Sequence, residues 1–154
     1  MDIKIVRAAS KDMAIVANSY LTKLIHDEKK YDKSINDNCI VNSLYDNFYE
    51  NENVCILLAK HNEEYVGYLF GNIIDTGDAY IIKKAKLDAM FVDENYRGNK
   101  IGVRLIEEFK KWAIKKDIRV IELTVCNDNK SAINLYEKCN FIKAKSVMEY
   151  HIGE

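Results

Sequence analysis

The sequence predicts an α/β fold whose mixed, mostly antiparallel central sheet has about seven strands and is flanked by four helices. Strand-like and helix-like apolar patterns follow one another in the order βααβββαβαββ, which suits one sheet covered by helices on both faces. A turn at residues 61–63 joins two strands into an antiparallel hairpin. One helix separates the strands expected at 84–92 and 118–125, so these two strands should be parallel neighbours.

Local patterns predict five elements in the first half of the chain. Ile3–Arg7 (IKIVR) alternates like a strand, and Ser10 or Asp12 can cap the helix that follows. The apolar stripe of that helix runs from Met13 to Leu24 at helical spacing. The remaining elements are a second helix with its apolar side at residues 40–48 and the hairpin strands Val54–Lys60 and Tyr65–Asn72.

The second half begins with the central strand at about 84–92. The helix after it runs from Gly102 to about Lys116, and its core stripe includes Leu105, Phe109 and Trp112. The elements expected after this helix are a strand at 118–125, a short helix that runs to about Cys139, and closing strands at 141–144 and 147–152.

Length and composition limit the class of protein. The chain has 154 residues, 48% hydrophobic and 31% charged, so we expect one domain spanning residues 1–154. A net charge of −1 provides no general attraction to nucleic acid or to an anionic membrane. No apolar run approaches the roughly 18 residues of a membrane span, and no signal peptide is present, so we expect a cytoplasmic protein. The 4 cysteines contain no CxxC pair and are expected to be reduced thiols rather than disulfides or metal ligands.

The most informative segment is Tyr96–Glu107 (YRGNKIGVRLIE), which carries two glycines and three basic residues and opens directly into a helix. It follows Leu87–Val92, which has the composition of a buried strand. Such a loop can hold a phosphate, because N–H groups at a helix start point outward and the helix dipole favours an anion there. Gly98 and Gly102 are expected to adopt positive φ and to let the backbone approach the ligand. We therefore expect the loop to bind pyrophosphate.

A second pattern lies at residues 127–141 (NDNKSAINLYEKCNF), where Asn129, Ala132 and Tyr136 have the spacing N-x-x-A-x-x-x-Y. Together with the loop, this pattern resembles the GNAT-type N-acetyltransferase superfamily. The resemblance covers essentially the whole chain in element order and is strongest over Leu87–Phe141. It implies the acyl-CoA N-acyltransferase fold of that family.

In the family, a loop R/Q-x-x-G-x-G/A holds the pyrophosphate of acetyl-CoA, and the pantetheine arm lies between two splayed parallel strands. The corresponding loop here is RGNKIG at 97–102, and Lys100 departs from the motif because a glycine usually stands at this place. Lys100 either reaches a CoA phosphate or points into solvent. Asn129 can cap its helix and contact CoA at the same time. The resemblance implies that acetyl-CoA is bound by Met90, Phe91, Val92, Arg97, Gly98, Asn99, Lys100, Ile101, Gly102, Val103 and Asn129.

The resemblance also implies a general acid. The family counterpart of Tyr136 lies beside the CoA sulfur and protonates the leaving thiolate, whereas the alternative is a core tyrosine of an amphipathic helix. A base on the central strand is a recurrent solution in the family, and Asp88 is the only carboxylate on this strand. Alternation places Asp88 on the same face as Lys86 and Met90, where it can accept a proton or hold a cationic amine. Its alternative role is an ion pair with a lysine of the strand.

These features predict an N-acetyltransferase that moves an acetyl group from acetyl-CoA to a primary amine by direct attack in a ternary complex, without a metal. A small-molecule amine is the preferred acceptor, and a protein N-terminus or lysine stays open. Lys100 keeps a catalytically silent CoA-binding sensor as an alternative. A nucleotide-binding protein is disfavoured by the absence of GxxxxGK(S/T). Dimers are common in the family, so a homodimer is possible, but the sequence reveals no interface.

Overall fold

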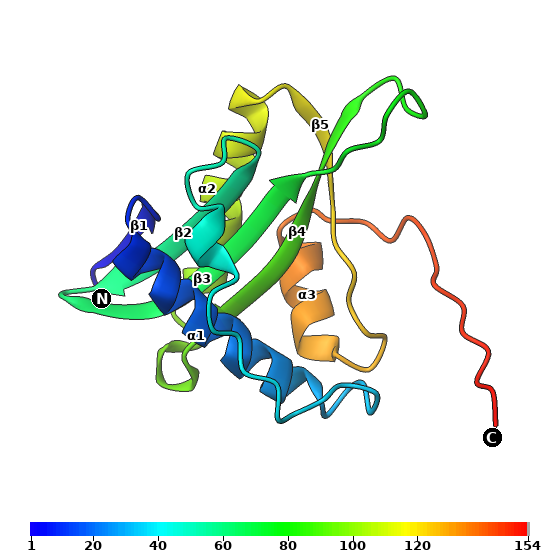
Figure 1. Cartoon of the computed structure of the whole chain (residues 1–154), viewed down its shortest axis with the longest axis horizontal. Helices are drawn as coiled ribbons and strands as arrows, with labels where there is room; N and C mark the ends of the chain where they lie inside the picture. Colours follow the sequence, from blue (N-terminus) through cyan, green and yellow to red (C-terminus); the bar gives the residue numbers. More distant parts are fainter. Residues whose placement is uncertain (154) are drawn as a thin grey trace.

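The computed structural model describes residues 1–153 and contains five strands, three α-helices and two short 3₁₀-helices. Figure 1 shows one sheet with helices on both faces. Within residues 1–153, no helix is long and apolar enough to cross a bilayer. In chain order the elements are β1 (Ile3–Arg7), α1 (Lys11–Glu28), η1 (Tyr45–Asn47), β2 (Val54–His61), β3 (Glu64–Ile73), β4 (Lys83–Val92), η2 (Glu94–Tyr96), α2 (Ile101–Lys115), β5 (Ile118–Glu122) and α3 (Lys130–Lys138).

The five strands form one sheet in the order β1-β2-β3-β4-β5. Every neighbouring pair is antiparallel except β4 and β5, which are parallel. The hairpin between β2 and β3 turns through Asn62, whose φ of 55° is in the left-handed region that asparagine tolerates. The expected antiparallel hairpin and the expected parallel neighbours are therefore both confirmed.

The sheet separates two apolar clusters. On one face, the helices α2 and α3 pack on the sheet, and Leu105, Ile106 and Phe109 of α2 are fully buried there. On the other face, α1 and η1 cover a cluster rich in aromatic rings, in which Tyr45 and Tyr68 are fully buried. Because both faces are covered, β2 and β3 in the middle of the sheet are buried along most of their length.

A bulge in β4 reverses the alternation of its side chains. In the register with β3, Leu87 and Ala89 have partners, whereas Asp88 between them has none. Leu87 packs in the α2 cluster, and the next β4 side chain in that cluster is Met90, three residues later instead of two. The expectation that Asp88 and Met90 share a face is therefore wrong, because the extra residue shifts the alternation by one.

The sheet has five strands rather than about seven, and three α-helices flank it rather than four. Residues 40–48 form only the turn η1, because the Asn18 side chain accepts a hydrogen bond from the Tyr45 N–H (2.9 Å) and donates one to Asp46 (2.8 Å). These bonds tie the segment to α1 and replace a helical ladder. Residues 141–152, where two strands were expected, lie outside the sheet and extend away from the end of α3 (Figure 1).

Gly71 of β3 lies directly against Phe109 of α2. A Cβ at this position would lie 2.2 Å from Phe109 Cζ and 3.0 Å from the Lys86 carbonyl oxygen, so the neighbours would have to move. We expect Gly71→Ala to lower the free energy of unfolding by about 1–3 kcal/mol through overpacking. Chemical denaturation measures this change. In a Phe109→Leu background the same substitution should cost less, since the nearest ring atoms are gone, and an equal cost would contradict the explanation.

Candidate active site

β4 and β5 are paired over only the first half of β4. The register runs from Lys83 opposite Ile118 to Lys86 opposite Glu122, and residues 87–92 have no strand partner on that side within residues 1–153. On its other side β4 stays paired with β3 up to Val92. The second half of β4 therefore presents backbone N–H and C=O groups to a gap between two parallel strands. An extended ligand can pair with such an edge.

The loop that follows β4 contains two residues with left-handed backbone. Gly98 has φ 84° and Lys100 has φ 61°, so the positive φ expected for Gly98 is confirmed. No heavy atom lies within 4 Å of a Cβ added at Gly98, so its backbone conformation and not a lack of space favours glycine there. Lys100 has a left-handed conformation that glycine adopts without strain, which explains why the family motif usually has a glycine at this position. The Asn99 side chain closes the loop by donating to the Tyr96 carbonyl oxygen (2.9 Å).

The N-terminus of α2 lacks the side-chain cap that the other two α-helices have. Ser10 accepts from the Met13 N–H (3.3 Å) at the start of α1, and Asn129 accepts from the Ala132 N–H (3.2 Å) at the start of α3. At α2 the capping position is Lys100, which makes no capping hydrogen bond, and the first turn contains no acidic residue. The first N–H groups of α2 are thus left for an acceptor from outside the helix, and the helix dipole favours an anion.

Gly102 does not have the positive φ expected of it, because it is the second residue of α2. A Cβ at Gly102 would lie 3.1 Å from Leu135 Cδ2 of α3 and 3.6 Å from Met90 Cε. The residue is small at this place because α3 packs on the first turn of α2. The side chain of Ile101 is buried in the core, so Ile101 can offer a ligand only its N–H group, whereas Val103 is partly buried.

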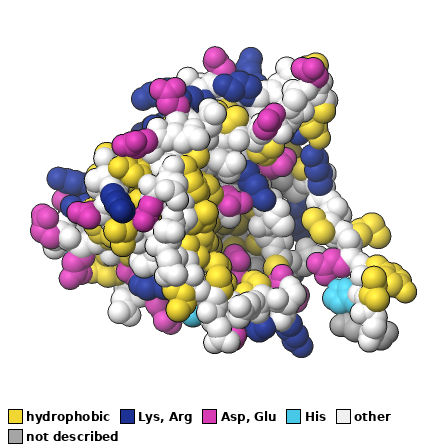
Figure 2. Space-filling view, viewed as in Figure 1, with side chains coloured by type: hydrophobic (Ala, Val, Ile, Leu, Met, Phe, Trp, Pro, Cys, Tyr) yellow, Lys and Arg dark blue, Asp and Glu magenta, His cyan; other side chains and the backbone are white. Residues whose placement is uncertain are grey.

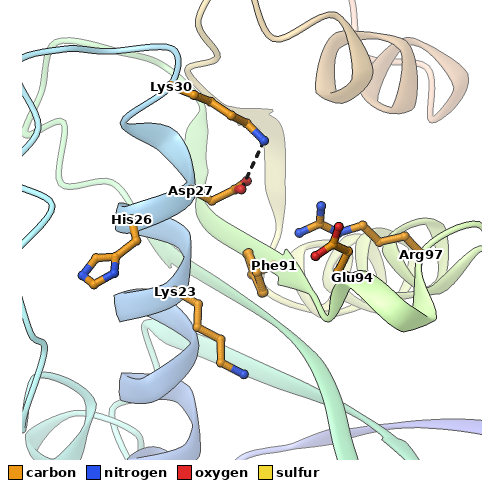
Figure 3. A pocket seen from close by; sticks show the side chains of 7 residues that line it. All are labelled: Lys23, His26, Asp27, Lys30, Phe91, Glu94 and Arg97. Carbon is orange, nitrogen blue, oxygen red and sulfur yellow. Dashed lines mark hydrogen bonds and ion pairs between the residues drawn. The ribbon is translucent and has the colours of Figure 1, made fainter.

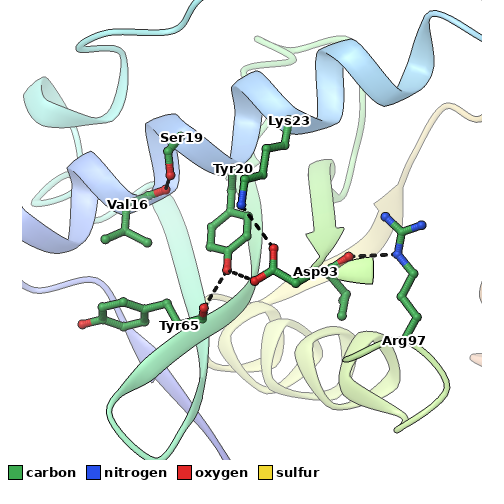
Figure 4. A network of polar contacts seen from close by, with 8 residues as sticks. Val16, Ser19, Tyr20, Lys23, Tyr65, Asp93 and Arg97 are labelled. Atoms are coloured by element: carbon green, nitrogen blue, oxygen red, sulfur yellow. Dashed lines mark hydrogen bonds and ion pairs between the residues drawn. The ribbon is translucent and has the colours of Figure 1, made fainter. Parts of the chain in front are cut away.

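A polar network fixes the start of the loop (Figure 4). Asp93, directly after β4, accepts from Lys23 Nζ of α1 (3.3 Å), and its other oxygen lies 2.9 Å from the Tyr20 hydroxyl. The same hydroxyl lies 2.9 Å from the Tyr65 carbonyl oxygen of β3. Arg97 Nε donates to the carbonyl oxygen of Val92 (2.9 Å). The contacts of Asp93 were not predicted, because Lys23, Tyr20 and Tyr65 lie far from it in the sequence and belong to no motif.

A cleft of about 420 Å³ separates α1 from the loop (Figure 3). The Arg97 guanidinium lies over the Phe91 ring, 5.1 Å from its centroid, on the loop side. On the α1 side, Lys30 forms an ion pair with Asp27 (3.1 Å). The cleft thus places two predicted cofactor residues, Phe91 and Arg97, opposite α1. Its lining residues are Lys23, His26, Asp27, Lys30, Phe91, Glu94 and Arg97.

Tyr136 lies on α3, on the α2 side of the sheet. Its ring is partly buried against the core and meets Phe141 edge to face, with centroids 5.8 Å apart. No group within residues 1–153 forms a hydrogen bond with its hydroxyl, which leaves that hydroxyl for a ligand. Burial raises the pKa of Tyr136 to about 12, and the charges of Glu28 and Cys139 act in the same direction. Tyr136 is therefore a neutral phenol with a proton to donate at neutral pH.

Asp88 projects from the bulge of β4 and is partly exposed. Its Oδ1 lies 3.5 Å from Lys86 Nζ. Asp88 therefore forms the ion pair with a lysine of its own strand that was considered as its alternative role. Both side chains are about 40% exposed, and a pair of this kind contributes little to stability. The geometry leaves Asp88 accessible to a ligand as well.

Glu28, the last residue of α1, is a candidate site residue that was not predicted. Burial raises the pKa of Glu28, and the carboxylates of Asp27, Asp32 and Asp88 raise it further. Its charge also acts on Tyr136, so it lies within electrostatic reach of both predicted catalytic residues. The apolar stripe that predicted this helix ends at residue 24, and the additional turn that carries Glu28 has no motif that marks it.

Cys126 follows the end of β5 in the sequence, and its thiol is exposed. Desolvation raises its pKa, and nearby carboxylates, including those of Asp32 and Glu28, raise it further. The thiolate that a nucleophilic cysteine needs is therefore disfavoured here. The site offers a phenol and carboxylates for proton transfer, but no activated thiol.

A model of the Acetyltransferase (GNAT) family matches residues 20–141. An N-acetyltransferase of Methanocaldococcus jannaschii, described as uncharacterised, is 39% identical over 57 residues, which are 37% of this chain and 25% of that protein. The streptothricin acetyltransferase of Escherichia coli is 37% identical over 57 residues, which are 37% of this chain and 33% of that enzyme. The matches thus span only about a quarter and a third of these relatives.

Solved structures share the whole fold at low sequence identity. A crystal structure of a mutant of the BH1408 protein from Bacillus halodurans superposes with a TM-score of 0.83 at 20% identity. The superposition covers 97% of this chain and 99% of that one. The order of strands and helices is therefore that of a known fold, and no assignment of substrate follows from this likeness.

Proposed function

Because the chain belongs to the Acetyltransferase (GNAT) family, we propose that it transfers an acetyl group from acetyl-CoA to the primary amine of a small molecule. The observation that carries the proposal is the uncapped N-terminus of α2 beside the unpaired half of β4. An anion site next to an open strand edge fits a cofactor that has a pyrophosphate at one end and an amide-containing arm at the other.

These two features support the following arrangement of acetyl-CoA. Its pyrophosphate accepts hydrogen bonds from N–H groups at the start of α2, from Ile101 to Val103, in the loop that Gly98 and Lys100 shape. Its pantetheine amides pair with the backbone of Met90 and Val92, as an additional strand would. Of the other predicted contacts, Phe91 and Arg97 line the cleft, and the Asn99 side chain closes the loop. Asn129 caps α3.

The reaction is a direct transfer. The amine nitrogen attacks the thioester carbonyl carbon, the C–N bond forms, and the C–S bond breaks with its electron pair on sulfur. A backbone N–H near Met90 polarises the carbonyl oxygen. Tyr136 donates its hydroxyl proton to the departing sulfur, and the proton that the amine loses returns through solvent to the phenolate. The mechanism uses no cysteine, in agreement with the raised pKa of the Cys126 thiol.

The acceptor amine enters from the α1 side of the gap. Glu28 and Asp88 place negative charge there, which attracts a protonated amine and can hold its proton when it reacts. A small-molecule acceptor agrees with the partial similarity to streptothricin acetyltransferase. Amines with more than one positive charge gain most from two nearby carboxylates.

Replacing Glu28 tests this assignment. We expect Glu28→Gln to raise the KM for a cationic acceptor about tenfold and to leave the Kd for acetyl-CoA unchanged. Since the pKa of Glu28 is raised, wild-type kcat/KM should fall as the pH drops through this pKa, and the variant should lose that part of the fall. Glu52→Gln, an exposed carboxylate in a loop, is the matched control. An unchanged KM and an unchanged acid limb would remove Glu28 from the site.

The substrate class is tested by release of free CoA thiol across a panel of amines. The panel contains polyamines, aminoglycosides, amino acids, a peptide with a free N-terminus and a peptide with an internal lysine. We expect turnover with polycationic small amines. Turnover confined to the peptides would move the assignment to protein acetylation, and binding of acetyl-CoA without turnover on any amine would support the CoA-binding sensor.

A further inference from the structure

Lys86 carries a primary amine at the point where β4 and β5 separate. In the register of these two strands, Lys86 opposite Glu122 is the last pair, and residues 87–92 have no strand partner on that side within residues 1–153. Ala85 and Leu87 pack in the α2 cluster, so alternation directs the Lys86 side chain to the α1 side of the sheet. This is the side from which the proposed acceptor amine enters the gap.

The ammonium group of Lys86 lies beside Asp88. Its Nζ is 3.5 Å from Asp88 Oδ1, and within residues 1–153 it forms an ion pair with no other carboxylate. Glu122, across the strand pair, lies instead 3.9 Å from Lys145 Nζ. Asp88 is a carboxylate that the proposed function offers to a cationic acceptor. Lys86 therefore holds, beside this carboxylate, the same chemical group that the acceptor would bring.

The contact between Lys86 and Asp88 is one that the lysine can leave. The two side chains are 40% and 44% exposed, and an ion pair as exposed as this one is easily broken. At about 3.3 Å per residue, Asp88 is roughly 7 Å along the strand from Met90, whose backbone N–H polarises the thioester in the proposed reaction. An amine tethered this close to a thioester reacts at a high effective concentration.

We propose that Lys86 is acetylated by its own chain, an inference that rests on the proposed function. Asp88 accepts a proton from the ammonium, Lys86 Nζ attacks the thioester carbonyl carbon, the C–N bond forms, and the C–S bond breaks with its electron pair on sulfur. Tyr136 donates its proton to that sulfur, and the proton on Asp88 returns through solvent to the phenolate. The products are acetyl-lysine and free CoA thiol, and the transfer needs no further reactant.

Acetylation of Lys86 changes what the site offers to an acceptor. The amide that forms carries no charge, so Asp88 loses its ion-pair partner. A cationic acceptor then no longer competes with a tethered ammonium for this carboxylate. The modified chain should therefore bind polycationic amines more tightly than the unmodified chain.

Mass spectrometry of the folded full chain, incubated with acetyl-CoA and no amine, tests the modification. We expect one acetyl group on Lys86, with a first-order rate constant that does not depend on protein concentration, because the transfer occurs within one chain. Excess CoA, which competes for the same site, should suppress this label but not the slow chemical labelling of an exposed lysine such as Lys111. An unlabelled Lys86, a label that CoA does not suppress, or a rate constant proportional to protein concentration would each contradict the proposal.

Calorimetric titration with spermidine, in the absence of acetyl-CoA, tests the competition at Asp88. We expect Lys86→Gln, which like acetyl-lysine is uncharged, to bind spermidine about two- to fivefold more tightly than the wild type. Lys86→Arg keeps the charge and should bind spermidine as the wild type does. Tighter binding by Lys86→Arg equal to that of Lys86→Gln would contradict competition between charges.

A matched control separates this competition from a general effect of charge. Figure 2 shows basic and acidic side chains interspersed over one face of the molecule, so the loss of any lysine alters the field that a cation meets. Lys111→Gln removes a lysine that is paired with Glu108 on α2 (2.9 Å) and should leave the affinity for spermidine unchanged. Equal gains in affinity for Lys86→Gln and Lys111→Gln would show that Lys86 does not compete at Asp88.

The same assays separate failure of this proposal from failure of the proposed function. Release of CoA thiol with an added amine, without a label on Lys86, would overturn self-acetylation and leave the enzymatic function standing. Absence of acetyl-CoA binding would overturn both.

Discussion

Tyr136→Phe is expected to lower kcat about 100-fold or more while the Kd for acetyl-CoA stays within about twofold of the wild type. The substitution removes only the hydroxyl, which has no hydrogen-bond partner within residues 1–153, so neither folding nor the packing against Phe141 depends on it. The thiolate then leaves without a proton donor. Steady-state kinetics with the best amine, together with calorimetry for acetyl-CoA, measures both quantities.

The pH profile separates the acid role from a packing role. Because burial raises the pKa of Tyr136 to about 12, its proton is retained across the neutral and mildly alkaline range. No loss of wild-type activity below about pH 10 should then come from ionisation of this phenol. Tyr49→Phe, which alters a partly buried tyrosine of the other apolar cluster, is the matched control. Wild-type turnover in Tyr136→Phe would return this residue to a structural role.

Lys100→Asp is expected to weaken acetyl-CoA binding roughly 10- to 100-fold relative to Lys100→Asn. Both side chains tolerate the left-handed backbone at this position, where φ is 61°, and they are nearly identical in shape. They differ by one negative charge at the first turn of α2. At about 5 Å and an effective dielectric constant near 20, that charge repels a phosphate by about 3 kcal/mol before screening by salt.

The free energy of unfolding of the two variants should not follow their affinity for acetyl-CoA. An aspartate beside a helix N-terminus usually stabilises the helix by about 0.3–1 kcal/mol, so Lys100→Asp should unfold no more easily than Lys100→Asn. Weaker acetyl-CoA binding without a loss of stability identifies an anion site. The affinity difference should shrink as salt is added. Equal affinities in the two variants would mean that no phosphate group lies at this helix terminus. Comparison of Lys100→Asn with the wild type decides whether Lys100 itself reaches a phosphate.

Much of the fold could be predicted because its signals are local. Alternation identified β1, and other strand-like apolar patterns identified β2 to β5 within a few residues. The amphipathic stripe containing Leu105 and Phe109 identified α2. The order of the elements predicted the parallel pair of β4 and β5. The expected helix at 40–48 failed for a tertiary reason, since hydrogen bonds from Asn18 hold this segment against α1. Two strands expected after α3 are missing because a strand pattern forms no strand without a partner.

The candidate site was predictable where it depends on motifs and unpredictable where it depends on register. The left-handed Gly98 followed from the loop sequence. The bulge at Asp88 did not, because it depends on how β4 aligns with β3. The bulge changes which neighbours Asp88 can meet and directs Met90 toward α2. Gly102 was assigned to the ligand, but its contact with Leu135 shows that helix packing also requires a small residue there.

Calorimetric titration of the wild-type protein with acetyl-CoA decides whether the loop and the open edge of β4 hold this cofactor. We expect saturable binding of one acetyl-CoA per chain. CoA without the acetyl group should bind with similar affinity, and the binding should weaken as salt is raised, because the pyrophosphate contributes much of it. Absence of binding at millimolar acetyl-CoA, with the protein folded, would contradict the placement of the cofactor and the proposed activity with it.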